Sequence, residues 1–131
     1  MAGISDYNKP LMLNWIAVMA QTPTRPSNIA VGLSVGTPVS SSGSEIATGS
    51  GYARATCSFN AAASPAGSVS NSNAMTFGPF SSGCTVQALQ VWDQTATGGN
   101  MLWFGQLATA RTLGAGDSLI INAGQCILTL S

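Results

Sequence analysis

The sequence contains no histidine and only eight charged side chains, four Lys or Arg and four Asp or Glu, among 131 residues. Histidine is the commonest general base and the commonest metal ligand, so its absence excludes Ser-His-Asp and Cys-His sites and zinc sites of the Cys/His type. No two carboxylates share a short motif, and Asp93 and Asp117 stand beside predicted turns, where Asp accepts backbone hydrogen bonds. We therefore predict a protein that is not an enzyme and needs no metal ion or cofactor.

The scarcity of positive charge excludes two classes of partner. One Lys and three Arg, none adjacent, cannot form the basic cluster that nucleic acid or an anionic membrane surface requires. The apolar run from Leu11 to Ala20 is too short to span a bilayer. A signal peptide is a second interpretation of this run, but Asp6 and Pro10 argue against it. We expect neither nucleic acid nor a membrane as a partner.

Cysteine is also scarce, with Cys57, Cys84 and Cys126 as the complete set. Three cysteines are too few for a four-Cys zinc site. They allow one disulfide and one free thiol, but nothing in their spacing resembles the framework of a secreted disulfide-rich protein. We expect three reduced, buried thiols that behave as small apolar side chains.

What the sequence does contain is apolar: 45% of its residues are hydrophobic and its net charge is zero. A neutral surface with few charges promotes association, so we expect the chain to belong to an assembly. The length fits one domain. We predict a single β-sandwich domain over 1–131, with a helical N-terminal segment over 1–27 and the sandwich itself over 28–131.

Residues 8–20 are predicted to form the only helix of the chain. Pro10 suits the first helical turn, where its missing N–H is not needed, and Asn8 is a suitable N-cap. Pro23 and Pro26 end the helix. The segment is apolar on nearly all sides, and one sheet can cover only one of them. That leaves another side for a partner chain.

Beyond residue 28, short apolar or alternating runs are separated by Gly, Ser, Pro and Asn, which is typical of β-strands joined by turns. The expected strands are 29–35, 52–59, 74–77, 85–93, 101–108 with a continuation to 113, and a terminal hairpin of 118–121 and 126–130. Residues 36–51 and 61–72 are expected to be loops. This spacing predicts an antiparallel β-sandwich or jelly roll.

Four residues are candidates for an interface. Met12, Trp15 and Met19 lie on one face of the predicted helix, although Trp15 fits the core of its own chain equally well. Arg54 lies on the polar face of strand 52–59, where it either pairs across a subunit boundary or stays solvated. The Ser- and Gly-rich loop 36–51 is a second candidate contact surface.

A series of short segments occurs in a characteristic order along nearly the whole chain. They are Met1-Ala-Gly-Ile-Ser-Asp-Tyr7, Ile29-Ala-Val-Gly-Leu-Ser34, Gly51-Tyr-Ala-Arg54 through to Phe59, Ser70-Asn-Ser-Asn-Ala-Met-Thr-Phe77, Gly98-Gly-Asn-Met-Leu-Trp-Phe-Gly-Gln-Leu107, Gly116-Asp-Ser-Leu119, Ala123-Gly124 and Ile127-Leu-Thr-Leu130. This order resembles a family of small virion proteins of tailed bacteriophages. Its members are labelled tail-fibre proteins or capsid decoration (cement) proteins.

The resemblance implies a β-sandwich structural protein without catalytic residues. We expect a decoration protein, made in the host cytoplasm, that binds the outside of the head and bridges subunits of the major capsid protein. A homo-oligomer is expected, and the resemblance suggests a trimer. The alternative is a tail-associated or tail-fibre protein that takes part in host recognition. A third interpretation, a secreted lectin, requires a signal peptide and exposed aromatic side chains, whereas we expect Trp92, Trp103 and Phe104 in the core.

Overall fold

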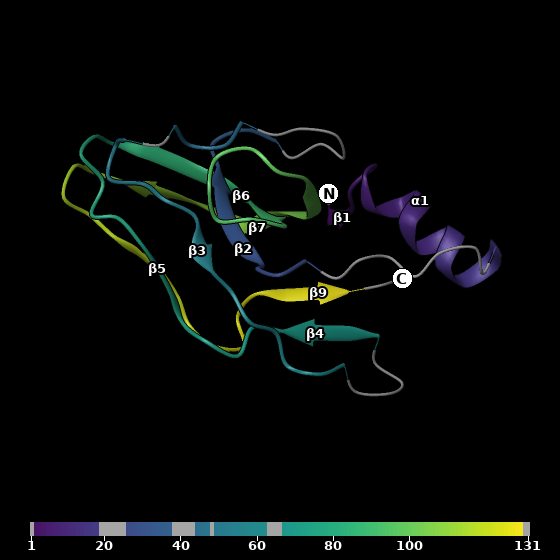
Figure 1. The fold of residues 1–131 in the computed structure, drawn as a ribbon. Helices are drawn as coiled ribbons and strands as arrows, with labels where there is room; N and C mark the ends of the chain where they lie inside the picture. The colour runs from purple at the N-terminus through teal and green to yellow at the C-terminus, as the bar shows by residue number, and fades with distance from the viewer. Residues whose placement is uncertain (1, 19–25, 38–43, 48, 63–66, 130–131) are drawn as a thin grey trace.

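The computed structural model describes residues 2–18, 26–37, 44–47, 49–62 and 67–129 (Figure 1). Within these ranges the fold is mainly β, as predicted, with one α-helix that a π-helical turn extends. In chain order the elements are β1 (Ala2–Ile4), α1 (Asn8–Leu13), η1 (Asn14–Val18), β2 (Ala30–Ser34), β3 (Ala55–Thr56), β4 (Ser68–Ser70), β5 (Met75–Phe77), β6 (Cys84–Trp92), β7 (Met101–Leu113), β8 (Leu119–Ile121) and β9 (Ile127–Thr129).

The larger sheet has the strand order β1-β7-β6-β2-β3, and every neighbouring pair is antiparallel. Its centre is the pair of long strands β6 and β7, whose alternating sequences give the sheet two distinct faces. The register aligns Leu33, Leu89 and Gly105 in one row across β2, β6 and β7. Strand β7 is continuous from Met101 to Leu113, so the predicted strand 101–108 and its predicted continuation to 113 form one strand.

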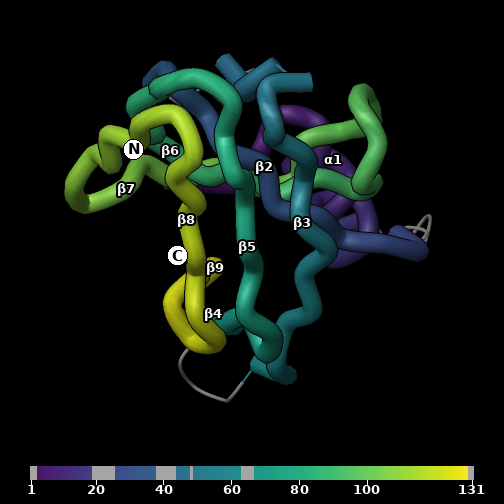
Figure 2. The backbone as a smooth tube through the Cα atoms, turned by 90° about the vertical axis from the view of Figure 1, so that its left-hand side faces the viewer, coloured from purple at the N-terminus to yellow at the C-terminus, as the bar shows by residue number. Residues whose placement is uncertain are grey.

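The predicted terminal hairpin of 118–121 and 126–130 is wrong. Strand β8 pairs with β5, and β9 pairs with β4, so the two consecutive strands have different partners. Figure 2 shows β8 beside β5, with β9 and β4 continuing beyond them. The reason is physical: segment 68–77 supplies the backbone partners of both strands, and no local turn pattern reveals such a distant pairing. Strand β4 lies in a stretch that the sequence predicted as loop.

The core lies between the larger sheet and these two ribbons. Val31 and Leu33 from β2 meet Phe77 from β5 and Ile121 from β8, and all four are buried. The ring of Tyr52 stacks on that of Phe77 with a centroid separation of 6.3 Å. Because both layers contribute buried apolar side chains to one cluster, the molecule is an antiparallel sandwich.

The N-terminal segment differs from its prediction in two details. Residues 2–4 form β1 and pair with β7, which the sequence did not predict. The helix begins as expected, but Asn8 is not its N-cap: the backbone N–H of Asn8 donates to the hydroxyl of buried Ser5 at 3.2 Å. In the part of the chain that the structure describes, no helix has the length and apolar character needed to cross a membrane.

Candidate interaction surface

The clearest exposed surface is the helical segment 8–18, formed by α1 and η1, which we call the arm. None of its residues is buried. Its exposed large apolar side chains are Leu13, Trp15, Ile16 and Val18, which are 52–64% exposed and lie around the helix rather than on a single face. Isolated exposed apolar residues are ordinary, but four large ones within six positions form a patch of the kind that marks an interaction site.

The arm is exposed because it is held only at its base. Ser5 fixes the start of α1 through its hydroxyl and its carbonyl oxygen, which accept from the backbone N–H of Asn8 at 3.2 and 3.1 Å. Lys9 pairs with Asp6 at 2.9 Å on the surface. Beyond this base the helix projects from the side of the sheets, as Figure 1 shows.

The candidate interface residues of the arm have different positions. Trp15 is half-exposed, so it is not a core residue of its own chain. Met12 is half-buried, whereas its neighbour Leu13 is exposed. Met19 lies outside the described residues. The sequence did not single out Leu13, Ile16 or Val18 as exposed, because the periodicity of a helix alone cannot tell which of its sides a sheet covers.

Arg54 is not solvated, and it finds its partners within its own chain. Its Nε and Nη2 atoms donate to the two carboxylate oxygens of Glu45 at 2.7 and 2.8 Å. Its Nη1 atom donates to three backbone carbonyl oxygens of the 94–98 loop at 2.8–3.1 Å. The guanidinium lies 3.9 Å from the ring centroid of Trp92, and the side chain is 3% exposed. Arg54 therefore contributes to the structure of one chain and is left out of the interaction surface.

Loop 36–51, the second candidate surface, is described at 36–37, 44–47 and 49–51. Glu45 turns inward to Arg54, and its Oε1 atom also accepts from the Tyr52 hydroxyl at 2.8 Å. Ile46 is buried in the core. No local pattern predicts the Glu45–Arg54 pair, because the two residues are nine positions apart and separated by a loop.

The thiols of Cys57 and Cys126 and the hydroxyl of Tyr52 belong to buried residues. Burial raises the pKa of the Cys57 thiol to about 12, with a smaller contribution from nearby Cys126. Burial also raises the pKa of Cys126 and that of Tyr52, the latter helped by the hydrogen bond to Glu45. All three cysteines are free, although Cys84 is only half-buried. Among the described residues, no three His, Cys, Asp or Glu side chains are grouped to hold a metal ion.

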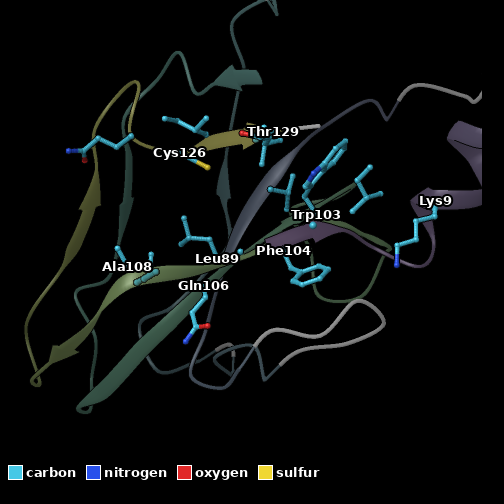
Figure 3. A pocket seen from close by; sticks show the side chains of 16 residues that line it. Lys9, Leu89, Trp103, Phe104, Gln106, Ala108, Cys126 and Thr129 are labelled. Atoms are coloured by element: carbon cyan, nitrogen blue, oxygen red, sulfur yellow. The ribbon is translucent and has the colours of Figure 1, made fainter. Parts of the chain in front are cut away.

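A second surface feature is a hollow of about 630 Å³ between β7 of the larger sheet and β9 of the ribbon (Figure 3). We call it the edge groove, because it follows the edge of the ribbon. Leu89, Trp103 and Leu107 line it from the larger sheet, and Ile127 lines it from β9. Lys9 stands at one end, next to the base of the arm. No sequence signal identified this groove, because it depends on which strand edges stay unpaired.

Comparison with known proteins places this architecture in a family. A search of curated proteins finds no match. The family model described as "Podophage GP4 fiber I protein gp80" matches residues 3–129, which is nearly the whole chain. The match covers the arm, both layers of the sandwich and the edge groove. The chain therefore belongs to the Podophage GP4 fiber I protein gp80 family, a family of structural proteins of the phage virion.

Proposed function

We propose that this virion protein is a decoration (cement) protein of the phage head, and that the arm is its contact with neighbouring chains. The observation that carries the proposal is the exposed patch of Leu13, Trp15, Ile16 and Val18. A soluble chain gains nothing from holding these side chains in water, whereas an assembled chain buries them. The major capsid protein is the partner that a decoration role requires.

The size of the patch limits how tightly one arm can bind. Full burial of a large apolar side chain stabilises by about 1.5–3 kcal/mol, so four half-exposed ones supply roughly 4–7 kcal/mol. Association costs about 4–15 kcal/mol in lost freedom of motion. A single arm therefore gives weak attachment, and stable attachment requires many linked copies or a further contact surface.

Decoration meets this requirement through repetition. A protein that binds the assembled shell but not its free subunits shifts the equilibrium toward the shell by mass action. The scarcity of charge also suits this role, because apolar contacts lose little strength when the salt concentration changes. The chemistry is adhesion rather than catalysis.

A second candidate is a fibre component that takes part in host recognition. The observation that favours it is the name of the family, which refers to a fiber protein. In that role the same arm would join the protein to a tail or fibre neighbour. The two candidates differ in the number of copies and in their location on the particle.

The deciding experiment is the number of copies per virion, measured by quantitative mass spectrometry against the major capsid protein. A second virion protein of known copy number serves as the internal standard. The decoration proposal predicts about one copy per capsid subunit, or a fixed fraction repeated over the shell. It also predicts that the protein stays with tail-free heads in a density gradient. A handful of copies that separate with the tails would overturn decoration and support the fibre role.

A further inference from the structure

We propose that the edge groove receives the arm of a second copy of this chain. This inference deepens the proposed function, because it names the partner of the arm, and it rests on the arm being a contact surface. It assigns a role to two features that the described residues of a single chain leave uncovered, one convex and one concave. Three observations carry it: the shape and edges of the groove, the chemistry of the two surfaces and the exposed area of the chain.

The groove is longer than its main hollow. A second hollow of about 400 Å³ continues it and shares Leu89, Leu107 and Ala108 with the first. In Figure 3, Leu89 and Ala108 lie along one wall, with Cys126 and Thr129 opposite. Within the described residues, β8 and β9 are each paired on one side only, so the groove runs along unpaired strand edges. Such a groove, lined by apolar side chains together with Gln106, Gln125 and Thr129, can take up the apolar side chains of a short helix laid along it.

The two surfaces match in chemistry. The outer side of the arm carries no charged side chain from Leu13 to Val18. Among the residues that line the two hollows, the only charged ones are Lys9 and Arg111, and Lys9 already pairs with Asp6. Burying one surface against the other therefore removes few charged side chains from water. The interface then avoids most of the free-energy cost of desolvating charges.

The chain exposes more surface than a compact monomer of its mass, and the excess area is close to the area that one partner buries in an interface. The chain exposes 7423 Å², whereas a compact monomer of this mass exposes about 6,400 Å². The excess of roughly 1,000 Å² compares with the ~800 Å² that each partner buries in a standard interface. A second copy is thus sufficient to cover the excess.

The position of the arm explains why the partner is another copy rather than the same chain. Lys9 stands at one end of the groove, and the helix then projects away from the sheets (Figures 1 and 3). The arm of one copy therefore reaches outward, and the groove of a neighbouring copy can accept it. Because arm and groove are different surfaces, contacts between copies give a reciprocal dimer, a ring where the rotation between copies closes, or an open filament where it does not.

The test is the molar mass of the full chain in solution, measured by sedimentation equilibrium for the native protein and three variants. Ile16→Asp places a charge on the arm, and Ala108→Trp fills the groove at an exposed position. Val35→Asp is the matched control, because Val35 is an exposed apolar residue outside both surfaces. We expect an oligomer for the native protein and Val35→Asp, and the single-chain mass of 13.2 kDa for the other two.

Three outcomes would overturn the inference. The first is a native protein that is monomeric at about 100 μM, a concentration above the μM to pM dissociation constants of standard interfaces. The second is an oligomer that persists in both Ile16→Asp and Ala108→Trp, and the third is an oligomer that dissociates in only one of these variants. A photo-crosslinking residue at position 16, in a mixture of ¹⁴N- and ¹⁵N-labelled protein, gives an independent measurement. Mixed-isotope crosslinks to 103–108 or 125–129 are expected, and their absence counts against the inference.

The design separates this inference from the proposed function. If Ile16→Asp loses binding to virions that lack the protein while the native chain is monomeric, the inference fails and the arm remains an attachment site. If the oligomer depends on both surfaces but the protein is found only on tails, the inference stands and decoration fails.

Discussion

At the residue scale, the Arg54 guanidinium joins its own segment to Glu45 and to the distant segment that contains Trp92 and the 94–98 loop. It forms a two-pronged ion pair with Glu45, donates to carbonyl oxygens of the 94–98 loop and stacks on Trp92. A planar group with five N–H donors is needed for this set of contacts, and lysine cannot supply it. The alternation of strand 52–59 predicted Arg54 on the polar face of the strand, but the structure buries its side chain, because its partners come from distant segments that local alternation cannot reveal.

Replacing Arg54 by Met should therefore lower the free energy of unfolding by about 3 kcal/mol. The variant removes the cation but leaves the Glu45 carboxylate and the loop carbonyls in a mostly buried site. Urea unfolding measures the change. Lys9→Met is the matched control, since its exposed pair with Asp6 is expected to contribute at most about 0.5 kcal/mol. Equal losses in the two variants would contradict the structural role of Arg54.

The Cys57 thiol makes stability depend on alkaline pH. Its pKa rises from an ordinary value of 9.0 to about 12 in the fold, mainly through burial. Below pH 9 the thiol is protonated in both states, and its full contribution to stability is present. Between pH 9 and 12 only the unfolded chain ionises, so the free energy of unfolding falls by about 1.4 kcal/mol per pH unit for this group.

Urea unfolding at pH 8 and at pH 10.5 tests this dependence on pH. The native protein should lose stability between the two values, and Cys57→Ala should lose less, because it lacks one ionising thiol. Val86→Ala, which truncates a buried side chain that does not ionise, is the control and should keep the native dependence on pH. A Cys57→Ala variant with an unchanged pH dependence would show that Cys57 does not resist ionisation in the fold.

At the scale of elements, Asn71 connects the two ribbons of the second layer. Its side chain donates to the carbonyl oxygens of Asn73 and Asn122 at 2.7 and 3.1 Å and accepts from the Cys126 N–H at 2.8 Å. Asn71 is fully buried at the point where pairing passes from β4–β9 to β5–β8. It thus supplies hydrogen bonds at the point where the β4–β9 ladder ends and the β5–β8 ladder begins.

Asn71→Ala is expected to destabilise the protein by about 3 kcal/mol, because it removes the hydrogen-bond partner of the buried Cys126 N–H and that of the Asn73 carbonyl oxygen. Asn60→Ala is the control: its amide makes one exposed contact of 3.4 Å to Ser70, so a change within about 0.5 kcal/mol is expected. Chemical denaturation of both variants gives the comparison. If Asn71→Ala lowers the free energy of unfolding no more than Asn60→Ala does, the connection between the two ribbons does not depend on the Asn71 side chain.

The elements also show how far a single sequence leads. Strands β2, β5, β6 and β7 were predictable, because each is an apolar or alternating run bounded by turn residues. Strand β4 was not, since Ser68-Val-Ser70 is short and polar and forms only through its partner β9. The terminal hairpin failed for the same reason. Local patterns identify strands, whereas pairing between distant segments decides which strands meet.

The same distinction applies to the arm. Its helical character and its apolar surface followed from the sequence, because Pro10 and the apolar spacing act locally. Its exposure did not follow, because that depends on where β1 joins the edge of the sheet. The edge groove lay further out of reach, since it is defined by strand edges that have no pairing partner in the described chain.

At the scale of the whole molecule, the absence of charge from Leu13 to Val18 of the arm predicts attachment that depends on one aromatic anchor and only weakly on salt. Trp15→Ala should keep the β fold, because the side chain is half-exposed and lies outside the sandwich core. It should weaken binding to virions that lack the protein by about tenfold or more, as the loss of an interface tryptophan commonly does. Native binding should change little between low and high salt, because few charges contribute to it.

Co-sedimentation with such virions measures the binding, and far-UV circular dichroism with urea unfolding measures the fold. Val35→Ala, an exposed apolar truncation away from the arm, is the control and should bind like the native protein. Unfolding of Trp15→Ala would place this side chain in the core and remove the arm as a contact surface. Binding that falls steeply with salt would instead point to the few charged residues, and the apolar patch would no longer account for attachment.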